Sequence, residues 1–419
     1  MRGIILVLAV FVGQVIAPRN ARSTEPTESF LKSLPAGVFL QSSALVAEAQ
    51  TETIAQRLGA EIDRLTNSKL RVQGRAIQVN AITARTETDA KHIHSVIGRN
   101  KPDPFCFRRG KLVIEYVGRG VDEALALKTS FELGLIEKPD RIAYRISAKL
   151  AAAETVDYMA CNPLFQQFIR LDQGEDAAKL EIGRLSKQFA FADTVRLRNP
   201  AYYSSKVEHQ FSKRPTGESK ENAQVSYKFS DLPNRLGIPY IDVAIQVIAD
   251  KDGLYEDPSE PRESLTASTK RWPANNEDLR ALAGRITQGK TTNDDKVQAI
   301  LEWLKPGAHI RYRGQTGSRW GTEQVFKQGY GHCWDFSDCF VTLARAAGVP
   351  SRQVAGWLYG SSGHVWAEYF REGVGWQQVD PTGGGELRCG IYHIPYFSTE
   401  DGEMPVVYLG MPTIERVTN

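Results

Sequence analysis

The 419-residue chain contains little cysteine and almost no excess of charge of either sign. Five residues are cysteine, which is too few for a disulfide scaffold, and the odd number leaves at least one thiol outside any pairing. Lysine and arginine number 52 against 49 aspartate and glutamate, which gives a formal net charge of +3. Because so small a charge creates no strong field for a polyanion, we expect no nucleic-acid partner.

Long apolar runs are also missing, except at the N-terminus. Met1-Arg2-Gly3 precedes the run Ile4 to Val12, which continues more weakly to Ala17. A basic start before roughly 14 mostly apolar residues is typical of a secretory signal and is shorter than the ~20 residues of a spanning helix. Residues 1–22 are therefore expected to be a signal peptide, which predicts a periplasmic or secreted protein. Pro18 would hinder cleavage after Ala17, so an uncleaved anchor stays open as the protein's contact with a membrane.

Residues 30–197 lack a glycine-rich phosphate loop, a metal-ligand cluster and an exact repeat. His92 and His94 stand two apart on an expected helix, where they would face different directions, so we expect no metal and no cofactor. Cys106 and Cys161 could form a disulfide if the protein is exported, although two unpaired buried thiols are the simpler alternative.

The hydrophobic pattern changes twice along the chain. Residues 30–197 alternate between helix-like and strand-like segments, with a helical pattern over 43–65, and predict a mixed α/β domain of unknown role. Residues 198–261 carry short strand-like runs between turns, and predict a small β module that ends in a linker near Pro261. The expected fold class is α+β, with residues 262–419 as a separate catalytic domain.

The segment around Cys333 is the first that indicates chemistry. Gly329 and Gly331 allow a sharp turn, and the residues after Cys333 carry apolar side chains at helical spacing. Cys333 is therefore expected at a helix N-terminus, where free N–H groups and the helix dipole stabilise a thiolate and lower the thiol pKa from ~8.5. Cys339 lies six residues further on and is expected to point into the core.

Two later segments supply partners for a thiolate. Gly363 to Phe370 and Trp376 to Asp380 are strand-like and flank a turn centred near Glu372. If these strands form a hairpin, His364 and Asp380 come to lie opposite each other. The carboxylate could then accept one imidazole N–H and leave the other ring nitrogen for the cysteine.

These segments resemble the core of the transglutaminase-like superfamily. Four blocks carry the resemblance in order and spacing: Gly331-His332-Cys333-Trp334, Ala347-Gly348-Val349-Pro350-Ser351-Arg352-Gln353-Val354-Ala355-Gly356-Trp357, His364-Val365-Trp366-Ala367-Glu368 and Val379-Asp380-Pro381-Thr382. The resemblance covers about a quarter of the chain. It implies a papain-like fold with Cys333, His364 and Asp380 as a catalytic triad, of the compact type found in exported bacterial proteins. His332 stands where animal members usually have glutamine, and no acidic cluster matches a calcium site, so calcium dependence is not carried over.

Acyl transfer is the chemistry that this triad implies. The Cys333 thiolate would attack an amide carbonyl of a peptide or protein, with cell-wall peptide as one candidate, and His364 would protonate the leaving amine. The backbone N–H of Cys333 is one expected oxyanion donor, and the second is open among Trp320, Gln324 and Gln328. Hydrolysis is slightly favoured over cross-linking. The alternative is a non-catalytic binding or scaffold protein with a vestigial triad, against which the intact Cys, His and Asp set argues.

Overall fold

A computed structural model describes most of the chain and divides it into two compact units, residues 1–137 and 138–419. The described residues are 34, 38–72, 75–101, 104–118, 122–153, 158–198, 209–221, 224–255, 261–314, 318–361, 363–383, 389–404 and 406–417. The expected signal peptide and most of the expected linker lie outside these residues. Among the described residues, no helix is both long and apolar enough to cross a membrane.

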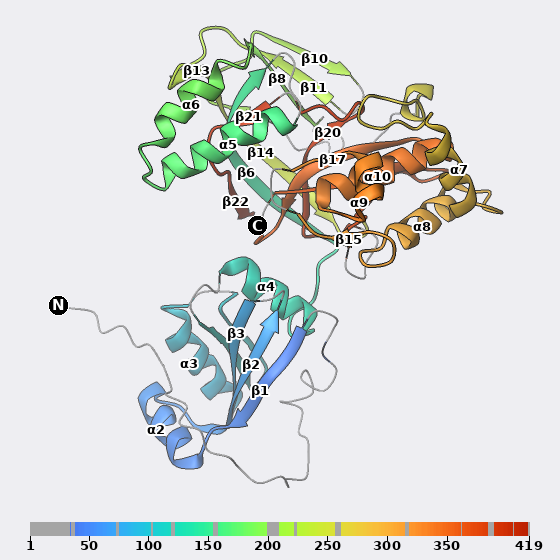
Figure 1. The fold of residues 1–419 in the computed structure, drawn as a ribbon. Coiled ribbons are helices and arrows are strands. Elements are labelled where there is room, and N and C mark those ends of the chain that lie inside the picture. The colour runs from blue at the N-terminus through green and yellow to red at the C-terminus, as the bar shows by residue number, and fades with distance from the viewer. Residues whose placement is uncertain are drawn as a thin grey trace. The chain divides into compact units, whose positions relative to one another are not determined.

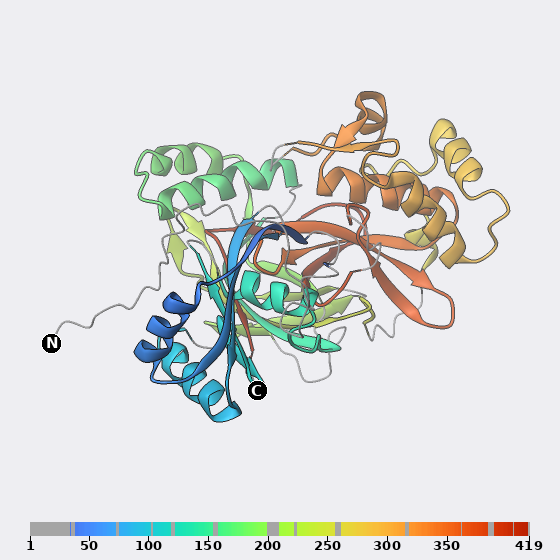
Figure 2. The same ribbon diagram turned by 90° about the horizontal axis from the view of Figure 1, so that it is seen from below.

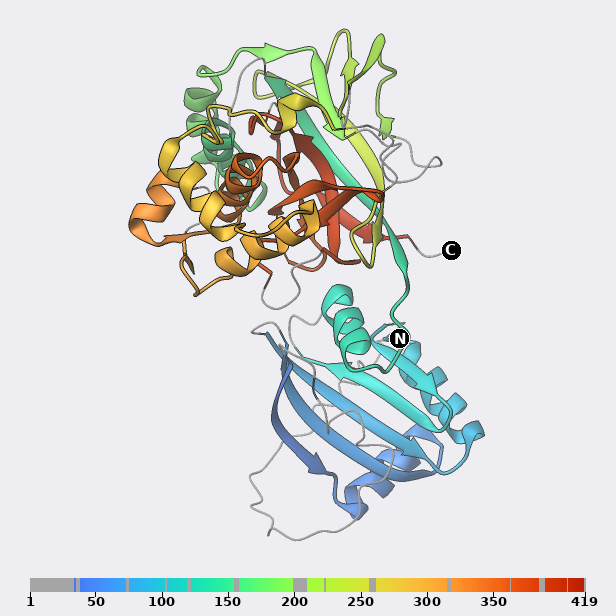
Figure 3. The same ribbon diagram turned by 90° about the vertical axis from the view of Figure 1, so that its right-hand side faces the viewer.

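The first unit is an antiparallel sheet with helices on both faces (Figure 1). Its strands run in the order β1-β2-β3-β5-β4. They are β1 (Val38–Leu45), β2 (Ile62–Val72), β3 (Arg75–Ala84), β4 (Cys106–Arg109) and β5 (Leu112–Val117), and the helices are α2 (Glu48–Leu58), α3 (Glu87–Gly98) and α4 (Glu123–Glu132). Alternate residues of β3 enter two different cores, one shared with α4 and the other with α2 and α3 (Figure 3).

The helical pattern expected over 43–65 is confined to α2. Helix α2 ends at Gly59, whose φ of 67° is left-handed, and the residues on either side belong to β1 and β2. The other segments of this unit follow the expected alternation of helix and strand.

The second unit begins with a long strand that gathers partners from distant parts of the chain. Strand β6 (Arg141–Ala153) lies in the sheet β21-β6-β14-β9 and also pairs with β7 and β22. The other strands and helices of this part are α5 (Tyr158–Asp172), α6 (Ala178–Ser186), β7 (Phe191–Ala192), β8 (Thr194–Arg198), β9 (His209–Phe211), β10 (Gly217–Glu221), β11 (Gln224–Lys228), β12 (Asn234–Arg235), β13 (Ile238–Pro239), β14 (Ile241–Asp250), β21 (Val406–Tyr408) and β22 (Thr413–Arg416). Figure 2 shows α5 and α6 side by side and apart from the helices α7 to α10.

The observed units do not coincide with the expected boundaries at 197 and 261. Strand β14 pairs with β6 along its whole length, from Ile241↔Leu150 to Asp250↔Arg141, and β21 and β22 return from the C-terminus to the same strand. Strands β9 and β14 therefore share one sheet with strands that precede and follow residues 198–261, and β10 and β11 pair onto β8, which is why residues 198–261 do not form a module of their own.

The remaining elements form a helical layer against a second sheet. The helices are η3 (Glu263–Leu265), α7 (Glu277–Ile286), α8 (Asn293–Leu304), α9 (Thr322–Gln328) and α10 (Cys333–Ala346). The strands are β15 (Arg311–Tyr312), β16 (Tyr330–Gly331), β17 (Ser351–Leu358), β18 (Gly363–Arg371), β19 (Gly375–Val379) and β20 (His393–Thr399), of which four form the sheet β19-β18-β17-β20. Helix α10 is the centre of this layer, because Phe336, Phe340 and Leu343 are fully buried in a core shared with α7, α8 and β18. Mixed helices and strands in one unit confirm the α+β class.

All five cysteines are described, and they form no disulfide. Cys106 and Cys161 are both free and buried, which agrees with the alternative of two unpaired buried thiols.

Candidate active site

Helix α10 begins at Cys333, in agreement with the sequence pattern. His332 is the N-cap residue, with φ −122° and ψ −164°. Asp335 fixes this turn, because its carboxylate accepts the His332 N–H at 3.2 Å and the Trp320 N–H at 2.8 Å. A Cβ on Gly331 would lie 2.7 Å from the Cβ of Asp335, so the approach to the helix requires glycine there. Asp335 thus caps the helix that carries the thiol.

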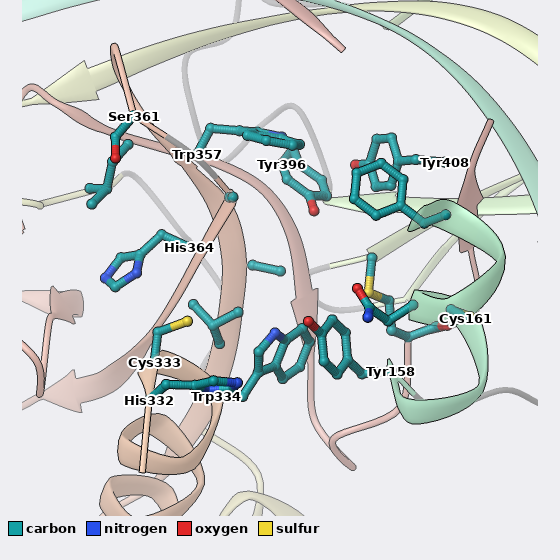
Figure 4. Close-up of a pocket in the computed structure, with 18 of the residues that line it drawn as sticks. Tyr158, Cys161, His332, Cys333, Trp334, Trp357, Ser361, His364, Tyr396 and Tyr408 are labelled. Atoms are coloured by element: carbon teal, nitrogen blue, oxygen red, sulfur yellow. Dashed lines mark hydrogen bonds between the residues drawn. The ribbon is translucent and has the colours of Figure 1, made fainter. Parts of the chain in front are cut away.

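The Cys333 thiol is partly buried at this helix end and faces His364 (Figure 4). Burial alone would raise its pKa, but the nearby imidazoles of His332 and His364 together outweigh burial and lower the pKa of Cys333 to about 6. The pKa of His364 moves the other way. Burial opposes its charged form, yet the Asp380 carboxylate and the thiol raise the pKa of His364 to about 10. Between about pH 6 and pH 10 the two groups therefore form a thiolate–imidazolium pair.

His364 lies beside Asp380, although the hairpin register differs from the expected one. The His364 Nε2 is 2.8 Å from the Asp380 Oδ2. Strands β18 and β19 pair from Arg371↔Gly375 to Ala367↔Val379, so the turn is centred on Gly373 and not on Glu372. Gly373 takes this place because its φ of 73° is left-handed. His364 and Asp380 meet because Asp380 follows the last paired residue of β19, and Nδ1 of the ring remains for the thiol.

His393 is a second histidine on the same carboxylate, and no motif in the sequence indicates it. Its Nε2 lies 3.1 Å from the Asp380 Oδ2. The other carboxylate oxygen accepts the Thr382 N–H at 2.9 Å and the Thr382 hydroxyl at 2.7 Å. Asp380 therefore accepts four hydrogen bonds, and these together with the nearby histidines hold the pKa of Asp380 well below its usual range, against the effect of burial.

His364, Asp380 and His393 also have the composition of a metal site, because their ligand atoms lie within 4.8 Å of one another. The hydrogen bonds point to protons instead. The Gly390 N–H donates to the His393 Nδ1 at 3.2 Å, so in the neutral ring the proton is on Nε2, the atom that faces Asp380. A metal bound at that nitrogen would move the ring proton to Nδ1, where it would face the Gly390 N–H.

The three expected candidates for a second oxyanion donor lie outside the cleft that holds the thiol. Gln324 donates to Gln328 at 3.2 Å, and Gln328 donates to the Tyr330 carbonyl at 2.8 Å. Trp320 is 36% exposed and its ring centre is 6.0 Å from that of His332. Tyr312, at the end of β15, does line the cleft. The residue is 52% exposed, but partial burial of its hydroxyl together with the neighbouring Cys333 raises the pKa of that hydroxyl. Strand β15 has only two residues, which is too short for a hydrophobic pattern from which the position of Tyr312 could have been predicted.

The triad opens into a cleft of about 780 Å³ (Figure 4). Its lining comes from α5, from the start of α10, from β17 and β18, and from the C-terminal strands β20 and β21. Among the described residues, those that line the cleft include no lysine, arginine or glutamate, and their only acid is Asp380. The cleft is therefore an uncharged space beside a charged pair.

Part of the chain that contains these residues matches known proteins. Residues 280–381 match the model of the transglutaminase-like superfamily. A protein-glutamine gamma-glutamyltransferase of Pseudomonas aeruginosa is 30% identical over 146 residues, which are 30% of this chain and 22% of the relative. The uncharacterised protein YebA of Bacillus subtilis is 28% identical over 131 residues, which are 26% of this chain and 18% of the relative. The chain thus spans about a fifth of each of these relatives.

One solved structure aligns with a larger part of this chain. The periplasmic domain of TgpA from Pseudomonas aeruginosa aligns with 58% of this chain and 88% of that domain, at 16% identity and a TM-score of 0.31.

Proposed function

Residues 280–381 belong to the transglutaminase-like superfamily, and from this premise we propose that the chain is an exported thiol enzyme that hydrolyses amide bonds of peptides or proteins. The observation that supports this most is the thiolate–imidazolium pair. At neutral pH the nucleophile is already ionised and its proton is already on the ring that must deliver it.

The reaction proceeds in two steps. The Cys333 thiolate attacks the amide carbonyl, and the backbone N–H of Cys333 with the Tyr312 hydroxyl stabilises the oxyanion. His364 gives its Nδ1 proton to the leaving amine, which departs as the thioester forms. His364 then takes a proton from water, the hydroxide attacks the thioester, and the acid leaves as the thiolate is restored. Asp380 keeps the ring in the orientation that this exchange needs.

Hydrolysis is favoured over cross-linking because of the charge of the cleft. A lysine amine approaches as an ammonium ion. Once the Cys333 thiolate has become the thioester, the residues that line the cleft offer that ion no anion except Asp380, which already accepts four hydrogen bonds. Water has no such cost. Cross-linking remains the second candidate because one relative is named a protein-glutamine gamma-glutamyltransferase.

The apolar N-terminal run supports export, and exported peptide, including cell-wall peptide, is the substrate class that we propose. Fractionation that recovers the protein only in the cytoplasm, with Met1 retained, would contradict export.

One experiment tests the chemistry. The purified protein and its Cys333→Ala variant are incubated with a peptide mixture and, separately, with a glutamine-containing protein and a fluorescent primary amine. We expect new peptide termini with the wild type, none with the variant, and little amine incorporation. Incorporation faster than hydrolysis would favour cross-linking. Absence of both reactions, with Cys333 no more reactive to iodoacetamide at pH 6 than Cys339 or Cys389, would favour a non-catalytic binding protein.

A further inference from the structure

One wall of the cleft is built by a helix that precedes the superfamily match by more than a hundred residues. Helix α5 (Tyr158–Asp172) contributes Tyr158, Phe165 and Ile169 to the lining, together with residues of β20 and β21. Residues 280–381 supply the triad, whereas most of this wall lies outside them. The chain therefore adds its own surface to a shared catalytic centre.

The wall reaches the residue next to the nucleophile through aromatic rings (Figure 4). Tyr158 stacks on Trp334, the residue next to Cys333, with ring centres 4.1 Å apart and an interplanar angle of 29°. Two turns further along the same face of α5, Phe165 meets Tyr408 edge-on at 6.1 Å. Tyr408 in turn meets Tyr396 at 5.4 Å and Trp357 at 6.3 Å. An aromatic surface thus runs from the thiol to the far end of the cleft.

Trp357 adds one polar group to this surface. Its side chain lines the cleft and the residue is 5% exposed. Among the described residues, none accepts a hydrogen bond from its indole nitrogen. A buried N–H without a partner is unfavourable, and a carbonyl of a molecule in the cleft would provide one.

We propose that this aromatic wall is the binding site for the acyl side of the substrate, that it selects a large apolar or aromatic side chain next to the scissile amide, and that the Trp357 N–H binds a carbonyl of the same peptide. The inference rests on the proposed acyl transfer at Cys333. A cleft of about 780 Å³ has room for such a side chain and the adjoining backbone. A charged side chain would lose its water against the aromatic wall, whose residues offer it no partner of opposite charge.

Binding is measured on the full chain with Cys333→Ala, so that no reaction intervenes. Blocked peptides that differ only in the residue before the amide, phenylalanine, leucine, glutamate or lysine, are titrated while tryptophan fluorescence is followed. We expect the phenylalanine and leucine peptides to bind at least about 100-fold more tightly than the glutamate and lysine peptides. Equal binding of all four would overturn the proposal.

A pair of variants on α5 locates the selectivity. Phe165→Arg brings a cation into the cleft, whereas Met159→Arg brings the same cation to a position on the same helix that is 41% exposed and does not line the cleft. In the Cys333→Ala background, Phe165→Arg should weaken binding of the phenylalanine peptide at least about 10-fold and strengthen binding of the glutamate peptide, and Met159→Arg should leave both unchanged. Identical results from the two variants would place the site elsewhere.

Trp357→Phe serves where the arginine variant does not fold. It keeps the aromatic ring and removes the N–H, so every peptide should bind about 10-fold more weakly while the preference for phenylalanine persists. No change in affinity would exclude the indole as a donor. The two hypotheses fail separately: selective binding without turnover of any peptide contradicts the proposed function alone, and turnover without selectivity contradicts the aromatic site alone.

Discussion

Two buried carboxylates on one hairpin have different partners: arginines surround Glu368, whereas histidines surround Asp380. Glu368 lies in the middle of β18 with its side chain fully buried, and forms ion pairs with Arg198 of β8 and Arg352 of β17. Asp380 follows β19, borders the cleft, and has two histidines as its partners. Both carboxylates are held in the charged form.

The difference lies in whether the partner can give up a proton. Arginine does not deprotonate in proteins, so the Glu368 cluster is fixed and contributes only to structure. Histidine exchanges its proton near neutral pH, so the charge beside Asp380 can move to the thiol and back. The same way of burying a carboxylate thus produces a rigid core or a proton-handling site, according to the cation that accompanies it.

Asp380→Asn should have the largest effect. The amide retains the shape of the carboxylate but loses the charge that stabilises the imidazolium, and its NH₂ group can favour the wrong tautomer of His364. We expect kcat to fall by roughly 10⁴-fold, with a melting temperature close to that of the wild type. A loss of turnover smaller than about 10-fold would remove Asp380 from the mechanism.

Glu368→Gln should act on stability instead of chemistry. It leaves Arg198 and Arg352 buried without their anion, so we expect the free energy of unfolding in urea to fall by about 3–5 kcal/mol. Glu302→Gln, at an exposed position of α8, is the matched control and should change it by less than about 0.5 kcal/mol. An equal small effect from both variants would mean that the buried cluster is not stabilising.

The contribution of the Glu368 cluster to the stability of the fold should depend on pH. Burial opposes ionisation, but Arg198 and Arg352 lower the pKa of Glu368 from 4.5 to about 2. Because the folded-state pKa is below the unfolded one, the stabilisation is present above about pH 4.5 and is lost as the pH falls toward 2. Wild-type stability should therefore decline more steeply in that window than the stability of Glu368→Gln.

The sequence was most informative where function is encoded locally. Cys333 could be assigned to a helix N-terminus because glycines and helical spacing lie within a few residues of it. The same reasoning centred the hairpin on Glu372, one residue early, since any of the turn residues could have taken the left-handed position that Gly373 occupies.

The groups that were missed are brought to the site by distant segments. His393, Tyr312 and helix α5 carry no motif, and only the fold places them around the cleft. The boundary near 197 failed for a similar reason: Arg198 pairs with a glutamate 170 residues later, and nothing near it in the sequence indicates that contact.

His364→Ala should change the thiol more than the fold. Removing the imidazolium should raise the pKa of Cys333 from about 6 toward the ~8.5 of a free cysteine. The rise should be incomplete, because the helix N-terminus and His332 still favour the thiolate. The rate of alkylation by iodoacetamide, followed from pH 5 to pH 10, reports this pKa. Cys339→Ala is the control, because burial keeps the pKa of Cys339 well above its usual value and its loss should not alter the curve. Identical curves for the wild type and His364→Ala would mean that no ion pair exists.

His393 should have the smallest effect, and its two replacements distinguish a positioning role from simple packing. His393→Leu removes one of four hydrogen bonds to Asp380, so we expect kcat to fall by about 10-fold. His393→Gln can place an N–H donor where the imidazole Nε2 lies, and should recover turnover to within about 3-fold of the wild type. The alkylation curve of Cys333 should shift little in either variant, because His364 keeps its own bond to Asp380. If glutamine impaired turnover as much as leucine did, the shape of the His393 ring would matter and not its N–H. His393 would then have a purely structural role, like that of the arginines that pair with Glu368.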